Sequence, residues 1–164
     1  MIDVIRADIT TLDVDAIVNA ANSGLLPGGG VCGAIHAAAG SELEVAAAAL
    51  APCPTGNAVV TPGFQLRARY VVHAVGPIWS GGSRSEPELL RQAYESAFRV
   101  ATQHGGIRSI AFPAISTGIF GFPKEPAAKI ATDVMREHAP EFDRIVACLF
   151  DAESVELYTR ALAH

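Results

Sequence analysis

The sequence lacks the cysteine patterns of disulfide-stabilised domains and of structural zinc sites. Its three cysteines, Cys32, Cys53 and Cys148, are odd in number, and no two of them form a C-x-x-C pair. Disulfide frameworks and zinc modules need paired cysteines at characteristic spacings. We therefore expect a protein of a reducing compartment without a structural metal, and we interpret Cys53 and Cys148 as structural residues of the interior.

Long hydrophobic runs and clusters of positive charge are also missing. Asp3, Arg6 and Asp8 interrupt the N-terminus, so neither a signal peptide nor a membrane span can be placed there. The formal net charge is -5, and no segment is rich in lysine or arginine. A broad electrostatic contact with nucleic acid is therefore not expected. These features predict a cytoplasmic protein with no membrane partner, for which a nucleic-acid partner is unlikely.

What the sequence does contain is enough apolar material for one substantial core. Half of its 164 residues are hydrophobic, and single domains commonly span roughly 100 to 200 residues. We therefore predict a single domain over residues 1–164. The negative charge does not exclude a small anionic ligand, because backbone N–H groups at helix N-termini bind phosphate without basic side chains.

Short apolar segments rich in β-branched residues alternate with segments of helical composition. This alternation predicts an α/β fold, a three-layer α/β/α sandwich with a mixed central sheet. Several of the strands are too uniformly apolar for an open sheet face and should be buried on both sides. The predicted strands are Ile2–Arg6, Ala16–Asn19, Asn57–Thr61, Tyr70–Ala74, Ser109–Pro113 and Ile145–Phe150.

The helix signals lie between these strands. Helices are expected to begin near Gly30, at Ser41, at Glu86, near Lys124 and at Glu153. Ser41 and Glu44 have the spacing of a capping box, in which the two side chains cap the first turn. The glycines and serines of Trp79–Ser85 predict a flexible surface loop.

The segment Asp15–Gly40, DAIVNAANSGLLPGGGVCGAIHAAAG, is the most informative part of the sequence, with the order strand, glycine turn and helix. Gly28, Gly29 and Gly30 permit backbone conformations closed to other residues and let a ligand approach the N–H groups that start the helix. This is an anion-binding geometry, although a tight structural turn is the alternative. No G-K-S or G-K-T is present, which excludes a P-loop, and the spacing fits a dinucleotide fingerprint poorly.

A second glycine-rich loop, Ala114–Pro123 (AISTGIFGFP), follows the predicted strand SIAFP. In open α/β sheets ligands bind at the carboxyl ends of the strands, so two such loops can close on one diphosphate from opposite sides. Phe120 lies between two glycines, where an aromatic side chain can pack against a sugar or a base. The alternative for Phe120 is a core residue that anchors the loop.

Several polar residues near these loops are candidates for ligand contacts. Asn19 and Asn22, at a strand end, can orient hydroxyl groups without adding charge beside a diphosphate, and turn stabilisation is the alternative. Asp8 can accept a hydrogen bond from an exocyclic amine such as adenine N6, and an N-cap is the alternative. Cys32 and His36, four residues apart, would share a helix face. A Cys/His dyad or metal pair is one reading, but no third ligand is placed, and His36 more simply orients a loop or satisfies a hydrogen bond.

As a set, five segments resemble the motifs of macrodomains of the MacroD type in order and spacing, and they cover essentially the whole chain. They are DAIVNAAN, LLPGGGVCGAIHAAAG, CPTGNAVVTPGF, YVVHAVGP and SIAFPAISTGIFGFP. The resemblance implies a three-layer fold that binds ADP-ribose. It also implies, for many members, hydrolysis of mono-ADP-ribose from acidic side chains or deacetylation of O-acetyl-ADP-ribose. Mono-ADP-ribosylated proteins are then partners, and no cofactor is implied.

The resemblance assigns a role to each matching position. Asp8, Ile9 and Phe150 would contact adenine, and Asn22 and Phe120 would contact the distal ribose. The diphosphate would lie between two loops, the first formed by Gly29, Gly30 and Val31 and the second by Ser116, Thr117, Gly118, Ile119 and Phe120. His36 would support the catalytic loop. The implied catalytic set is Asn22, Cys32, His36, Gly118 and Phe120.

One position departs from the family pattern. The usual string is G-G-G-V-D-G, and Cys32 stands where the family has the aspartate that orients or activates the hydrolytic water. A thiol is a poor general base unless a cationic neighbour stabilises its thiolate. We therefore expect hydrolysis by a water held between the diphosphate and the distal ribose. A non-catalytic ADP-ribose reader is the alternative, and a redox- or metal-sensitive protein using Cys32 and His36 is a third possibility.

Overall fold

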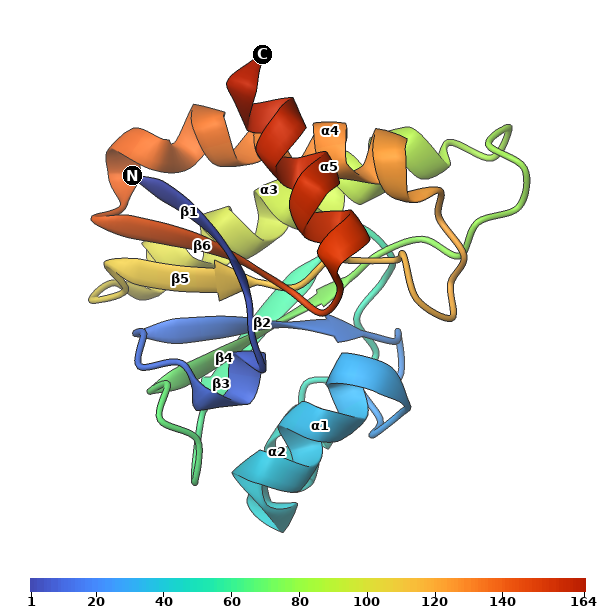
Figure 1. The fold of residues 1–164 in the computed structure, drawn as a ribbon. Helices are drawn as coiled ribbons and strands as arrows, with labels where there is room; N and C mark the ends of the chain where they lie inside the picture. The colour runs from blue at the N-terminus through green and yellow to red at the C-terminus, as the bar shows by residue number, and fades with distance from the viewer.

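The computed structural model describes residues 1–164, and its centre is a six-stranded sheet in the order β1-β6-β5-β2-β4-β3 (Figure 1). All neighbouring strands are parallel except β3 and β4, which pair antiparallel. The mixed sheet predicted from the sequence is therefore confirmed. The strands are β1 (Ile2–Arg6), β2 (Ala16–Ala21), β3 (Ala58–Pro62), β4 (Tyr70–Val75), β5 (Ser109–Phe112) and β6 (Arg144–Leu149).

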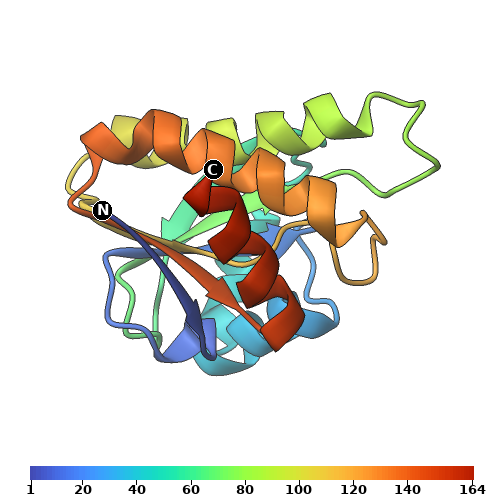
Figure 2. The same cartoon turned by 45° about the horizontal axis from the view of Figure 1, so that its top comes forward.

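Helices cover both faces of this sheet, which confirms the three-layer sandwich (Figures 1 and 2). One face carries α1 (Gly30–Ala39) and α2 (Ser41–Ala48) with the short 3-10 helix η1 (Ile9–Thr11). The other carries α3 (Glu86–His104), α4 (Lys124–His138) and α5 (Ala152–Ala163), with η2 (Ala139–Glu141) after α4. None of these helices has both the length and the apolar character needed to cross a bilayer.

Alternating side chains of the strands supply the two cores. Ile17 packs in the cluster that includes Ile35 of α1 and Leu43 of α2. Its neighbour Val18 belongs to the opposite cluster, which includes Phe98 of α3. Successive side chains of a strand point to opposite faces, so both faces of β2 are apolar. The four inner strands are buried on both sides as predicted, whereas the edge strands β1 and β3 are partly exposed.

Helix α2 begins at Ser41 as predicted, but its predicted cap and the start of α5 differ from the prediction. The capping box of Ser41 and Glu44 is wrong, because Gly40 is the N-cap of α2 and no side chain caps this helix. Gly40, with φ of 89°, also ends α1, so Ser41 already lies inside the second helix. Helix α5 begins one residue early, at Ala152, because the Asp151 carboxylate accepts a hydrogen bond of 2.7 Å from the Ser154 N–H.

The sheet order brings the two glycine-rich loops together. Strands β2 and β5 are parallel neighbours, with Ala16 opposite Ile110 and Ile17 opposite Ala111. Parallel strands end at the same edge of a sheet, so the segments that follow β2 and β5 emerge side by side. The fold thus places Asn22 and the loop to α1 next to the loop from Ala114 to Pro123.

Candidate functional site

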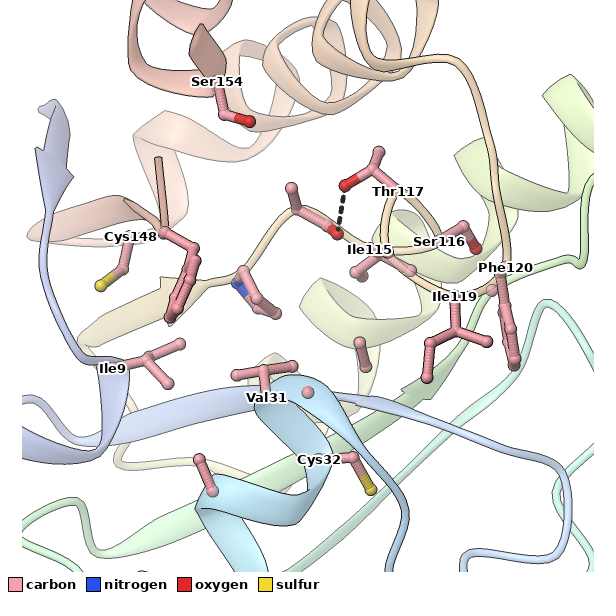
Figure 3. Close-up of a pocket in the computed structure, with 18 of the residues that line it drawn as sticks. Ile9, Val31, Cys32, Ile115, Ser116, Thr117, Ile119, Phe120, Cys148 and Ser154 are labelled. Carbon is pink, nitrogen blue, oxygen red and sulfur yellow. Dashed lines mark hydrogen bonds between the residues drawn. The ribbon is translucent and has the colours of Figure 1, made fainter. Parts of the chain in front are cut away.

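A cleft of about 890 Å³ lies at this edge of the sheet (Figure 3). Its volume falls in the range of roughly 300–1,000 Å³ that is usual for small-molecule sites. Every predicted site residue except His36 and the buried Asn19 lines it: Asp8, Ile9, Asn22, Gly29, Gly30, Val31, Cys32, Ser116, Thr117, Gly118, Ile119, Phe120 and Phe150. Segments that are distant in the sequence therefore meet in one cavity.

The first wall is the turn between β2 and α1, which the Asn22 side chain holds in shape. Asn22 Oδ1 accepts a hydrogen bond of 3.0 Å from the Leu26 N–H, and Asn22 Nδ2 donates one of 2.8 Å to the Leu26 carbonyl oxygen. One amide hydrogen and one lone pair of Asn22 remain for a ligand. The two readings of Asn22 are thus compatible, since it stabilises the turn and also lines the cleft.

This wall depends on Gly33, a glycine that sequence reasoning missed. A Cβ atom on Gly33 would lie 2.4 Å from the carbonyl oxygen of Gly28, so only glycine lets helix α1 sit this close to the loop. A glycine inside a helical segment was the available signal. At the helix start, the N–H groups of Gly29, Gly30 and Val31 have no acceptor in the protein and are free for an anion.

The second wall is the loop from Ser116 to Phe120, which presents a row of free backbone donors. None of its five N–H groups donates a hydrogen bond within the protein. Ser116 adopts the left-handed conformation, with φ of 69°, and its buried hydroxyl has no partner. A Cβ atom on Gly76 would lie 2.2 Å from Ser116 Oγ, so Gly76 is a second glycine that the sequence reasoning missed. Unpaired N–H groups in such a turn form a concave binding site for anions.

The two walls approach each other across the cleft. The Ile119 side chain reaches toward the first loop, and a Cβ atom on Gly29 would lie 3.3 Å from Ile119 Cδ1 (Figure 3). Ile119 is nevertheless 87% exposed, because it spans the opening. A bound diphosphate between the loops would therefore have backbone donors on both sides and an aliphatic cover.

The end of the cleft near β1 and β6 has a different character. Asp8 caps η1, because its Oδ1 accepts hydrogen bonds from the N–H (2.9 Å) and hydroxyl (2.7 Å) of Thr10. Its Oδ2 atom accepts no hydrogen bond within the protein, and Asp8 lines the cleft. Phe150 is 91% exposed at the rim. Exposure of an aromatic ring to water is unfavourable unless a ligand or partner covers it. Three charged lining residues also escaped sequence reasoning because they carry no local motif: Arg6, Lys124 and Asp151.

Cys32 lies on the first turn of α1 with its thiol buried. Its Sγ donates to the Leu26 carbonyl oxygen at 3.6 Å and accepts from Asn19 Nδ2 at 3.7 Å. The Asn19 amide also lies 3.2 Å from His73 Nδ1, and His73 Nε2 lies 3.0 Å from Thr61 Oγ1. No cationic side chain bonds or pairs with the Cys32 sulfur. The thiol is therefore a hydrogen-bond donor in this site and lacks the neighbour that would make it a base.

His36, one turn after Cys32, does not line the cleft. Its Nδ1 is buried without a hydrogen-bond partner, and its ring centroid lies 6.5 Å from that of His73. Burial lowers the pKa of His36, although Glu44 partly opposes this effect. No group of three or more His, Cys, Asp or Glu side chains lies close enough together to hold a metal ion. The predicted role of His36, to support the catalytic loop, stays a prediction.

Comparison with known proteins identifies the family to which this sequence is similar. The model of the Macro domain family matches residues 18–131. A macro domain-containing protein of Ralstonia nicotianae is 57% identical over 158 residues, which are 96% of this chain and 92% of that protein. An O-acetyl-ADP-ribose deacetylase of Enterobacter cloacae is 48% identical over 98% of this chain and 93% of its own length.

The solved structures agree with the sequence relatives. The macrodomain of Oceanobacillus iheyensis, solved with ADP, superposes with a TM-score of 0.91 at 38% identity and covers 98% of this chain and 88% of that one. A mutant of the same macrodomain was solved with ADPR. The family model spans both glycine-rich loops that form the walls of the cleft, and it covers well over half of the sequence. The chain belongs to the Macro domain family.

Proposed function

We propose that the protein binds ADP-ribose in this cleft and hydrolyses esters of its distal ribose. The substrates would be O-acetyl-ADP-ribose and mono-ADP-ribose attached to acidic side chains of proteins. The observation that carries the proposal is the pair of glycine-rich loops with unpaired N–H groups on opposite sides of one cleft. The deacetylase name of the Enterobacter cloacae relative and the ADPR of the Oceanobacillus iheyensis mutant support it.

The ligand would lie along the cleft with adenine near Phe150 and the distal ribose near Phe120. Asp8 Oδ2 would accept a hydrogen bond from adenine N6, while Ile9 and the exposed Phe150 ring would pack on the base. The free N–H groups of Gly29, Gly30 and Val31 would face those of residues 116–120 across the diphosphate. Backbone donors bind such an anion without a net positive protein charge.

At the other end, the remaining donor and acceptor of Asn22 would hold a hydroxyl group of the distal ribose. Phe120 would pack on the opposite side of this sugar, and His36 would support the loop from the helix behind it. A water between the diphosphate and the ribose would attack the ester carbonyl carbon. A phosphate oxygen of the ligand would take a proton from this water, and a proton would pass to the departing ribose oxygen. The products are ADP-ribose and a carboxylate, with one proton released.

In this mechanism positioning does most of the work, because Cys32 cannot replace the usual carboxylate. Its thiol hydrogen is directed at the Leu26 carbonyl oxygen and no cation is near it. Holding a water and an ester carbonyl in reactive geometry removes the entropic cost of bringing them together, which can account for several kcal/mol of the barrier. Backbone N–H groups that stabilise developing negative charge add to this effect.

The test is an assay of ester hydrolysis on O-acetyl-ADP-ribose and on a protein carrying mono-ADP-ribose on glutamate. The natural chain is expected to release ADP-ribose from at least one of them. The variant Gly118→Glu, whose carboxylate would occupy the diphosphate loop, is the negative control. Release no faster than with this variant would exclude the enzymatic function.

The buried Cys32 thiol favours a second candidate, a non-catalytic ADP-ribose reader. A site without a base can keep its affinity while it loses turnover. Calorimetric binding of ADP-ribose without hydrolysis, together with hydrolysis gained in Cys32→Asp, would establish this second function. Binding together with hydrolysis by the natural chain would exclude it.

A further inference from the structure

Glu86 is the only buried carboxylic acid of the chain, at 1% exposure, and the proposed chemistry does not use it. It occupies the first position of α3, and no basic side chain pairs with it. Its carboxylate instead accepts hydrogen bonds from the N–H groups of Ser80 (2.7 Å), Gly82 (3.0 Å) and Arg84 (2.6 Å). The loop Trp79–Ser85, which lies largely on the surface as predicted, is thus wrapped around one carboxylate.

This arrangement keeps Glu86 ionised. Burial by itself would raise the pKa of the Glu86 carboxyl, but the backbone donors of the loop outweigh this effect and lower the pKa to about 2. Hydrogen bonds to an ionised acceptor are stronger than those between neutral groups. At neutral pH the charged carboxylate therefore organises the backbone around it.

The anchored loop in turn contacts the second wall of the cleft through Trp79. The Trp79 N–H donates a hydrogen bond of 2.8 Å to the carbonyl oxygen of Phe120. The Trp79 ring packs edge-on against buried Phe122, with 4.8 Å between ring centroids. Gly82, with φ of 90°, lies against the indole, since a Cβ atom there would be 2.7 Å from Trp79. The indole is therefore fixed between the loop and Phe122.

Phe120 is the residue through which this support reaches the cleft. Its side chain lines the cavity beside Ile119 (Figure 3). Its own N–H is unpaired, and the hydrogen bond from Trp79 is the only one that its backbone makes. The position of Phe120 therefore depends on the loop that Glu86 holds.

We propose that Glu86 is a positioning residue, which acts through Trp79 to hold Phe120 against the distal sugar of the ligand. The proposal rests on the function proposed above, since it requires that ADP-ribose places this sugar beside Phe120. A positioning role predicts different effects on the binding of ADP-ribose and of ADP, which a general structural role does not predict. ADP lacks the distal sugar, so loss of the Glu86 contacts should weaken binding of ADP-ribose more than binding of ADP.

The experiment measures the dissociation constants of ADP-ribose and ADP by calorimetry for the natural chain and for Glu86→Gln. The neutral amide would turn an N–H donor toward backbone donors, so the loop should loosen. We expect the preference for ADP-ribose over ADP to fall about ten-fold, the equivalent of one lost charge-assisted hydrogen bond. Glu88→Gln, an exposed glutamate two residues along the same helix, is the matched control and should leave the preference unchanged.

Two further measurements keep the proposal open to refutation. Trp79 is the only tryptophan, so its fluorescence reports directly on the loop, and the change on binding ADP-ribose should shrink in Glu86→Gln. If this variant does not fold, Gly82→Ala displaces the indole while keeping the carboxylate, and it should lower the same preference. An unchanged preference in the folded variant overturns the proposal. Failure of the natural chain to bind ADP-ribose at all would instead overturn the proposed function.

Discussion

Asn22 and Cys32 donate hydrogen bonds to the same acceptor, the main-chain carbonyl oxygen of Leu26. The distances are 2.8 Å from Asn22 Nδ2 and 3.6 Å from Cys32 Sγ. The residue proposed to hold the distal ribose and the residue proposed to replace the catalytic aspartate are therefore coupled through one atom of the turn. Any substitution of Cys32 that removes the hydrogen-bond donor will therefore also affect the position of the Asn22 side chain.

This coupling shapes the first prediction, for Cys32→Asp. A carboxylate can accept a proton from the attacking water, and general base catalysis contributes roughly 100- to 10,000-fold. It would also face the Leu26 carbonyl oxygen, which repels it, so the gain should lie at or below the lower end of this range. We expect hydrolysis to rise about 10- to 100-fold while affinity for ADP-ribose changes less than about three-fold.

The matched control is Cys32→Asn, whose amide has the shape of aspartate and can still donate to Leu26. It should not accelerate hydrolysis, because it cannot take a proton. Equal rates for Cys32→Asp and Cys32→Asn in a single-turnover assay would show that a base at this position does not assist the reaction.

Gly118 provides a test of the diphosphate loop that does not disturb the fold. Nothing lies within 4 Å of a Cβ atom built on Gly118, and its backbone conformation is open to other residues. We expect Gly118→Glu to keep the melting temperature but to weaken ADP-ribose binding about 100-fold or more, because like charges placed together cost several kcal/mol.

The comparison variant is Gly118→Ala, which adds bulk but no charge. Its affinity should stay within about three-fold of the natural chain. A Gly118→Glu protein that binds ADP-ribose normally would place the diphosphate elsewhere.

Gly33 should behave against the general rule for helices. Replacing glycine by alanine inside a helix usually stabilises it by about 0.5–1 kcal/mol. Here the new Cβ atom would lie 2.4 Å from the Gly28 carbonyl oxygen, so the helix and the first loop must move apart. We expect Gly33→Ala to lower the free energy of unfolding by about 1–3 kcal/mol and to weaken ADP-ribose binding. Urea unfolding measures the first effect, and an increase in stability would contradict the close approach.

Local signals explain why much of the site could be predicted. Gly28–Gly30 and the loop Ala114–Pro123 are short segments next to apolar strands, so their position at strand ends follows from the sequence alone. Parallel strands place such loops at one edge. Family resemblance then assigned roles to individual residues, such as Asp8 and Phe150, that spacing alone leaves open.

The parts that could not be predicted depend on contacts between distant residues. Gly76 must be glycine because Ser116, 40 residues later in the sequence, packs against it. The Ile115 N–H donates a hydrogen bond of 3.1 Å to the hydroxyl of Tyr94, which lies 21 residues earlier. The role of Glu86 depends on Trp79 meeting Phe120. A glutamate at a helix start resembles an ordinary favourable charge near the helix dipole, so its burial cannot be foreseen.

His73 gives a last prediction, on the pH dependence of stability. Burial, together with the smaller effect of nearby His36, lowers the pKa of His73 from 6.5 to about 4. In the unfolded chain the imidazole takes up a proton near its ordinary pKa, whereas in the folded chain it resists until about pH 4. The unfolded state therefore binds more protons in this window, and stability falls as the pH drops from about 6.5 to about 4, by about 3 kcal/mol in all.

Urea unfolding between pH 7.5 and 4 should reveal this loss in the natural chain and should show it reduced in His73→Gln, which has no imidazole to protonate. The exposed C-terminal His164 supplies the control, since His164→Gln should retain the acid-dependent loss.

His73 is also linked to Cys32 through Asn19, whose side-chain amide contacts both His73 Nδ1 and Cys32 Sγ. The same window should therefore affect ligand binding, because a proton on His73 Nδ1 would oppose the Asn19 amide hydrogens. If the free energies of unfolding of the natural chain and of His73→Gln changed in parallel with pH, His73 would titrate normally. The contacts among His73, Asn19 and Cys32 would then not be sensitive to acid.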